Sequence, residues 1–246
     1  MTESDIAEVG GTGPAAPGEP AGTEAPGSGL LVRALKLFVS PGALFDELRE
    51  NPRWIGALVL AIALTVLVTI LIPGDVFMEY VRGQMARRRA DIPQDALERG
   101  MQIARITRYL GPVVGTLIGA FLISGVLYLV FELGMGGEAG FRPVLASTSH
   151  ALIIPAVGGL VTLPVIIRTG DLAASLSLDL LMPGIGGYPG RLLHGMNFFG
   201  LWAAVVLGLA MAHIYRKRSP GGSIAFSVGV YVAFKAVLAL VGAGGA

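Results

Sequence analysis

The feature that most constrains this chain is an uncharged apolar run from Trp54 to Ile72. A hydrocarbon core about 30 Å thick is crossed by roughly 20 apolar residues in a helix, and this run has about that length. A helix that is apolar on every face must be buried on every face. Arg49 and Arg53 precede the run and Pro73 follows it, which gives the run the flanks of a membrane interface. The run predicts a transmembrane helix.

Composition supports a membrane protein. Of the 246 residues, 53% are hydrophobic and 14% are charged, whereas soluble domains average about 25% charged residues. The formal net charge is +1, and no basic face of the kind that binds nucleic acid is visible. The chain has no cysteine, and its histidines show no ligand spacing. We therefore expect no nucleic-acid partner, no metal site and no cofactor.

The apolar pattern predicts an all-α, polytopic membrane protein with five transmembrane helices and interfacial amphipathic helices. The spans are expected at about residues 54–72, 110–131, 142–167, 198–215 and 223–241, in a membrane domain of residues 30–244. Residues 1–29 are rich in Gly, Pro, Ala and Glu and cannot offset the entropy of becoming ordered. They predict a disordered leader, not a cleavable signal peptide, and a partner-docking tail is the alternative.

Amphipathic segments lie between the spans. Residues 41–50 and 76–108 are expected to lie along the membrane interface, the second as two helices separated near Pro93. For residues 41–50, packing against the protein's own spans is the alternative. The triplet Arg87–Arg89 either meets anionic lipid or forms a solvated helix face. In the connector after the third span, residues 171–182 predict an interfacial or re-entrant helix, followed by a glycine-rich loop.

Small residues recur at intervals of four in three of the spans. Such stripes let helices approach closely in lipid, where van der Waals packing replaces the hydrophobic effect. We expect these stripes to pack within the chain, with homodimerisation as the alternative. The residues concerned are Gly111, Gly115 and Gly119 in the second span, Gly200, Ala204 and Gly208 in the fourth, and Gly229 in the fifth.

Four ionisable residues within the predicted spans are candidate functional residues, because a charge inside a membrane is costly. Lys235 is expected to extend its side chain to the far interface. Glu132, His150 and His213 belong near one membrane face, where a Glu132–His150 hydrogen bond is allowed and a proton relay is the less favoured interpretation. The third span also holds the polar run 147–150 and two prolines, which predict either a kinked span or a broken helix at a transport site.

Three motifs resemble bacterial members of the Yip family of Ypt- or Rab-interacting membrane proteins. They are FFGLW at 198–202, GFRPVLASTSHALIIP at 140–155, and P-x3-F-x2-L-x3-P-x-W, formed by Pro41, Phe45, Leu48, Pro52 and Trp54. The resemblance covers roughly residues 38–242. It implies a five-span helical domain with a cytosolic N-terminus and the C-terminus on the opposite side. Eukaryotic relatives are associated with Rab-type GTPases, but the leader here lacks their Tyr/Gly-rich motif, so no Rab partner is carried over.

The sequence contains no catalytic triad, phosphate-binding loop or membrane carboxylate cluster, so we expect no enzyme. The expected function is that of a scaffold in the inner (cytoplasmic) membrane that binds protein partners or organises lipid. A small transporter or channel subunit that uses the broken third span is the alternative. Positive charge is spread over both sides, so it does not choose the orientation, and the resemblance alone implies a cytoplasmic N-terminus.

Overall fold

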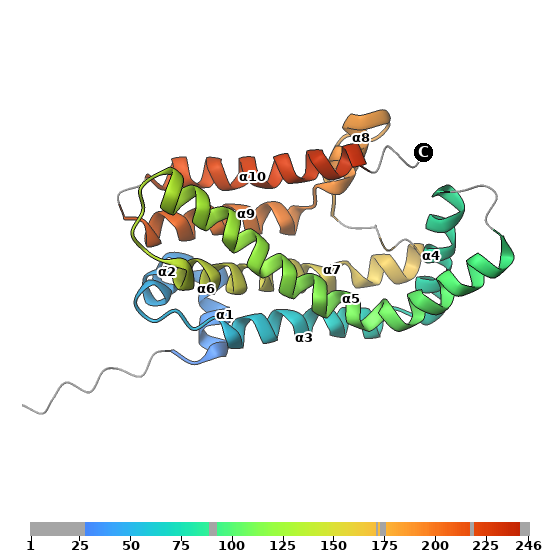
Figure 1. Cartoon of the computed structure of the whole chain (residues 1–246), viewed down its shortest axis with the longest axis horizontal. Helices are drawn as coiled ribbons and strands as arrows, with labels where there is room; N and C mark the ends of the chain where they lie inside the picture. The colour runs from blue at the N-terminus through green and yellow to red at the C-terminus, as the bar shows by residue number, and fades with distance from the viewer. Residues whose placement is uncertain (1–27, 89–92, 171, 173–175, 217–218, 242–246) are drawn as a thin grey trace, which may run out of the picture.

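The computed structural model describes residues 28–88, 93–170, 172, 176–216 and 219–241. The regular secondary structure of these residues is helical, apart from one isolated β-bridge between Ser177 and Asn197. The prediction of an all-α membrane protein is confirmed. Five longer helices run side by side along the length of the molecule (Figure 1): α3 (Ile55–Leu71), α5 (Gln94–Tyr128), α7 (Ile153–Thr169), α9 (Phe198–Ile214) and α10 (Pro220–Val241).

Shorter helices gather at the two ends of this bundle (Figure 1). One end carries α1 (Leu30–Val39), α2 (Pro41–Glu50) and α6 (Phe141–Ala151), and the other carries α4 (Gly74–Arg88) and α8 (Gly187–Gly195). The first described helix and the end of the last one therefore lie at opposite ends of the molecule. The predicted leader, apart from residues 28–29, lies outside the described residues, as do the side chains of the Arg87–Arg89 triplet.

Among the described residues, three helical segments are long and apolar enough to cross a membrane: Gln94–Gly134, Phe141–Thr169 and Pro220–Leu240. A fourth span is obtained if α3 and α4 are counted together, although they are bent by 92°. The apolar helix α9 has 17 residues, so it is about 25 Å long, less than the thickness of the hydrocarbon core. The protein is therefore polytopic, and the count of five spans stays a prediction.

Arg108 closes the corner between α3 and α4. Its guanidinium Nη2 donates hydrogen bonds to the carbonyl oxygens of Thr69, at 2.8 Å, and Ile72. The Cζ atom of the same guanidinium lies over the Phe77 ring, 4.9 Å from its centroid. Thr69 lies in the last turn of α3 and Ile72 directly follows the helix, where no intrahelical donor remains for these carbonyls. The side chain of Arg108 thus caps α3 and holds α4 across the bundle axis.

The second predicted span is part of a much longer helix. We expected an amphipathic helix up to residue 108 and a separate span at 110–131, but α5 continues into η1 (Leu129–Gly134), a π-helical turn, without a break. The whole segment has 41 residues, about 60 Å by helical rise. The expectation of two elements was wrong because no cluster of turn residues separates them. Pro112 lies inside the helix and removes one backbone donor without ending it.

The third predicted span consists of α6 and α7, which are interrupted at Leu152. The interruption lies three residues before Pro155. A proline ring collides with the carbonyl four residues earlier, which here belongs to Ala151, the last residue of α6. The predicted irregularity of this span is therefore present as a local break between two consecutive helices.

The short helix α9 lies at the centre of the bundle. It packs against α2, α6, α7 and α10, and nine of its residues are buried. The apolar face of α2 covers one end of this core, and Leu44, Phe45 and Leu48 are fully buried. The expectation that residues 41–50 lie along the interface was therefore wrong. Their apolar face finds its partners inside the protein, which is the alternative that the sequence left open.

The small-residue stripes have different surroundings. A Cβ atom at Gly208 would lie 2.4 Å from the Cα of Ile224, and one at Gly200 would lie 2.5 Å from the Tyr231 hydroxyl, so these glycines permit the close approach of α9 to α10. Ala204, between them, is buried. At Gly111, Gly115, Gly119 and Gly229, in contrast, an added Cβ atom would meet no atom of a neighbouring described element within 4 Å, so the packing of these two stripes within the chain stays a prediction.

The connector also differs from the expectation. In its described part, residues 171–182 contain the single 3₁₀ turn η2 (Leu178–Leu181), and the helix α8 begins inside the predicted glycine-rich loop. Two side chains of α8 explain why a helix forms there. Tyr188 donates to the carbonyl of Ala236 at 3.2 Å and Arg191 donates to that of Ala239 at 3.4 Å. Tertiary contacts with α10 thus stabilise α8 although its own sequence is poor in helix formers.

Candidate functional site

An ion-pair network joins α1 to α2. The Glu47 carboxylate accepts hydrogen bonds from Arg33 Nε at 2.8 Å, Lys36 Nζ at 2.9 Å and the Ser28 hydroxyl at 2.6 Å. Arg33 is buried, with 3% of its surface exposed. Burial acts to raise the pKa of Glu47, but the hydrogen bonds from these side chains outweigh burial and lower the pKa from 4.5 to about 2.

A second pair joins α2 to the end of α9. His213 Nδ1 lies 3.0 Å from Asp46 Oδ1. Gly42, at the start of α2, packs against the same imidazole, and a Cβ atom there would lie 3.0 Å from its Cε1 atom. His213 therefore positions α2 on the bundle through one polar contact and one packing contact.

Glu132 orders the loop between η1 and α6. Its carboxylate accepts the backbone N–H groups of Ala139 and Gly140, both at 3.1 Å, and the hydroxyl of Tyr215 at 2.8 Å. The Tyr215 ring stacks on Phe131 with centroids 5.6 Å apart. Glu132 therefore fastens this loop to the residue that follows α9.

His150 and Ser147 lie in the fully buried part of α6. His150 Nδ1 bonds to the carbonyl of Ala146 at 2.8 Å, within its own helix. The other ring nitrogen of His150 and the Ser147 hydroxyl are buried without a hydrogen-bond partner among the described residues. The Glu132–His150 hydrogen bond that the sequence allowed is not formed. His150 bonds to a carbonyl of its own helix, and Glu132 bonds to the loop before α6 and to Tyr215.

These contacts lie at the end of the bundle that carries α1 and α2, which we call the polar end. It is defined by Arg33, Lys36, Asp46, Glu47, Glu132, His213 and Tyr215. The sequence analysis identified Glu132 and His213 but missed their partners, because Asp46 and Glu47 look like members of a solvated helix face. One available signal was the pair Arg33 and Lys36, which lie one turn apart on an otherwise apolar helix and need a shared anion.

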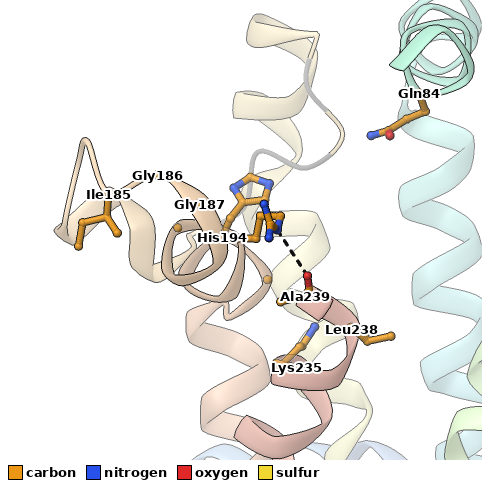
Figure 2. A pocket seen from close by; sticks show the side chains of 11 residues that line it. Gln84, Ile185, Gly186, Gly187, His194, Lys235, Leu238 and Ala239 are labelled. Atoms are coloured by element: carbon orange, nitrogen blue, oxygen red, sulfur yellow. Dashed lines mark hydrogen bonds between the residues drawn. The ribbon is translucent and has the colours of Figure 1, made fainter. Parts of the chain in front are cut away.

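Lys235 lies at the other end of the molecule. It lines a cavity of about 600 Å³ between α4, α8 and α10, together with Gln84, Arg191 and His194. Figure 2 shows Gln84 reaching from α4 toward the side of the cavity formed by α8 and α10. Lys235 Nζ lies 5.6 Å from the centroid of the Tyr231 ring. Lys235 is thus separated by the length of α10 from the polar end.

No set of three His, Asp or Glu side chains in the described part of the chain is arranged to bind a metal ion. What the polar end does offer is attachment: each of its charged groups joins two elements. The fold and this end together define a multi-pass, all-α membrane protein with amphipathic helices fixed to one end of its bundle.

The chain belongs to the Yip1 family, because the family model of the Yip1 domain matches residues 35–242. The resemblance in the motifs around Trp54, Trp202 and Pro155 is thereby confirmed. The chain is also similar to the membrane protein YknW of Bacillus subtilis (strain 168), with 24% identity over 181 residues, 71% of this chain and 75% of the relative. No solved structure matches the chain. Neither the family's description nor the relative's name denotes an enzymatic activity.

Proposed function

We propose that the protein is a non-enzymatic scaffold of the inner (cytoplasmic) membrane, and that its polar end faces the cytoplasm and binds protein partners. The observation that carries this proposal is the use of the polar groups. Glu132 and His213, suspected of chemistry because they lie at the membrane, hold a loop and α2 in place. These contacts give both groups a structural role that requires neither a substrate nor a proton relay.

The polar end is also well placed to act as a rigid platform. α1 turns Arg33 inward to Glu47 and presents an apolar face outward, where Leu31 is 73%, Leu35 65% and Val39 80% exposed. An outward apolar face beside the bundle fits the lipid interface. α1 would then anchor the platform laterally. A cleft of about 380 Å³ lies between the end of α2, the loop before α6 and the end of α9, and it is lined by Arg49, Glu138 and Arg216 among others.

Photo-crosslinking in native membranes tests the proposal. A photoreactive amino acid at Glu138, which lines the cleft, should give reproducible protein adducts. The matched control position is Arg105, which is exposed on α5 toward the opposite end. Identical sets of abundant bystander proteins from both positions, or lipid adducts alone from Glu138, would refute protein scaffolding. Accessibility of tags on the two termini tests the proposed orientation.

The break between α6 and α7 favours a transporter or channel subunit as the second candidate. Ser147 and His150 lie just before the break, with polar atoms buried and unpaired among the described residues. If they line a transport path, cysteines at 147–150 should react with hydrophilic thiol reagents, and reconstituted protein should carry a solute or proton flux. Unreactive cysteines together with absent flux would exclude this candidate.

A further inference from the structure

We propose that the cavity between α4, α8 and α10 binds the phosphate group of an anionic phospholipid. This inference concerns the end of the bundle opposite the polar end and does not depend on the scaffold function. It rests on three properties of the cavity, namely its charge, its depth in the membrane and its apolar surroundings.

The ionisable groups that line the cavity are basic. They are Arg191, His194 and Lys235, and no carboxylate of the described residues lines the cavity with them. Asp179 lies outside the lining, and one of its carboxylate oxygens lies 2.8 Å from His194 Nδ1, so this histidine already has a carboxylate partner. The net positive charge of the cavity therefore comes from Lys235 and Arg191.

Both of these cations keep donors available. Lys235 has no hydrogen bond or ion pair within the described part of the chain, and its recorded contact is the Tyr231 ring. Arg191 uses Nε on the Ala239 carbonyl, which leaves its two terminal nitrogens without a partner among the described residues. An ammonium and the open end of a guanidinium suit the oxygens of a phosphate group.

The backbone beside these cations leaves room for a ligand. Glycines at 186, 187, 190 and 195 line the cavity. At Gly190 a side chain is excluded by the chain itself, because a Cβ atom would lie 2.0 Å from the carbonyl oxygen of Ile185. The tight turn before α8 thus depends on glycine, and it brings Arg191 beside the last turns of α10.

The depth of the cavity identifies lipid as the source of the phosphate. Lys235 precedes the end of α10 by six residues, about 9 Å by helical rise, so that its side chain reaches the interface where phosphates of lipids lie. Leu238 and Ile185 line the cavity next to the cations. Leu181, just before the turn, is 77% exposed. Cations bordered by exposed apolar side chains match a lipid, whose phosphate meets the cations and whose acyl chains meet the apolar side chains. A free phosphate would leave those apolar side chains without a partner.

Native mass spectrometry of the delipidated full chain, released from detergent, tests this site. We expect phosphatidylglycerol to bind more tightly than phosphatidylcholine with the same acyl chains. Lys235→Gln should lower that preference about fivefold, the effect of one cation near a lipid surface. Lys235→Arg should retain the preference. Arg105→Gln, which removes an exposed cation outside the cavity, should leave it unchanged.

Each contrary result overturns the proposal. Equal binding of the two lipids by the wild type, or an unchanged preference in both Lys235→Gln and Arg191→Gln, would show that the cavity does not recognise anionic lipid. Displacement of phosphatidylglycerol by millimolar inorganic phosphate would identify free phosphate as the ligand instead. Because the preference is a ratio of two lipids measured on one variant, a general loss of stability does not imitate the expected result.

Discussion

Glu47 provides the sharpest test of how α1 and α2 are held. We predict that Glu47→Gln lowers the free energy of unfolding by about 3 kcal/mol at neutral pH. A pKa reduced from 4.5 to about 2 corresponds to this value, at about 1.4 kcal/mol for each pH unit. The Glu47 side chain is 18% exposed, so solvent screens it weakly. The burial of Arg33 supports a loss of the same magnitude, because removing one partner of a buried ion pair lowers the free energy of unfolding by about 3–5 kcal/mol.

The pH dependence has a defined sign. The pKa of Glu47 is lower in the folded protein than in the unfolded chain, so its contribution is complete above pH 4.5 and is lost as pH falls toward 2. Wild-type protein should therefore lose about 3 kcal/mol more than Glu47→Gln over this range. Reversible unfolding in mixed micelles, followed by circular dichroism at a series of pH values, measures both quantities.

The matched control is Glu50→Gln, on the same helix but exposed and without a side-chain hydrogen bond to the described residues. It should change the free energy of unfolding by less than about 0.5 kcal/mol. If the Glu47 and Glu50 variants were equally stable at neutral pH, or if the Glu47 variant kept the wild-type acid transition, the network would not be what fastens α1 to α2.

Three further predictions concern packing, a loop and a corner. Gly208→Val should lower the thermal midpoint in detergent sharply, because a Cβ atom there would lie 2.4 Å from the backbone of α10. Gly111→Val should change the midpoint little, since a Cβ atom there would meet no neighbouring described element within 4 Å, and equal effects would contradict the packing described. Tyr215→Phe should lower the free energy of unfolding, measured by chemical denaturation, by about 1.5–3 kcal/mol, because it removes a hydrogen bond to the Glu132 carboxylate. A loss below about 0.5 kcal/mol, the size expected of a neutral surface substitution, would show that this bond does not stabilise the fold. Arg108→Gln should speed hydrogen exchange in the last turn of α3, and unchanged exchange would show that the turn does not need this cap.

The helical class could be predicted from the sequence because hydropathy acts locally. The uncharged run at 54–72 contains α3, which ends at Leu71, two residues before Pro73, where helices commonly end. In the same way, apolar length sufficed to indicate a polytopic chain. These features need no knowledge of which segments become neighbours.

The sequence did not determine which helices would become neighbours in the fold. The four-residue spacings of small residues around Gly115 and around Ala204 look alike in the sequence. The stripe of α9 nevertheless packs closely on α10, whereas a Cβ atom added at the glycines of the α5 stripe would meet no neighbouring described element within 4 Å. A glycine permits close approach but does not name the helix that approaches. For the same reason Glu47 looked solvated until α1 folded back over it, and α8 looked like a loop until α10 supplied acceptors for Tyr188 and Arg191.

The shortness of α9 has a consequence for how the bilayer accommodates this molecule. If a 17-residue helix were surrounded by lipid, the membrane would have to thin locally, or side chains flanking the helix would have to extend toward the interface. Here neighbouring helices enclose it, and α2 covers one of its ends like a lid. Exposed apolar side chains lie instead on α3, α5, α7 and α10, so it is mainly these helices that present the hydrophobic thickness the surrounding membrane must match.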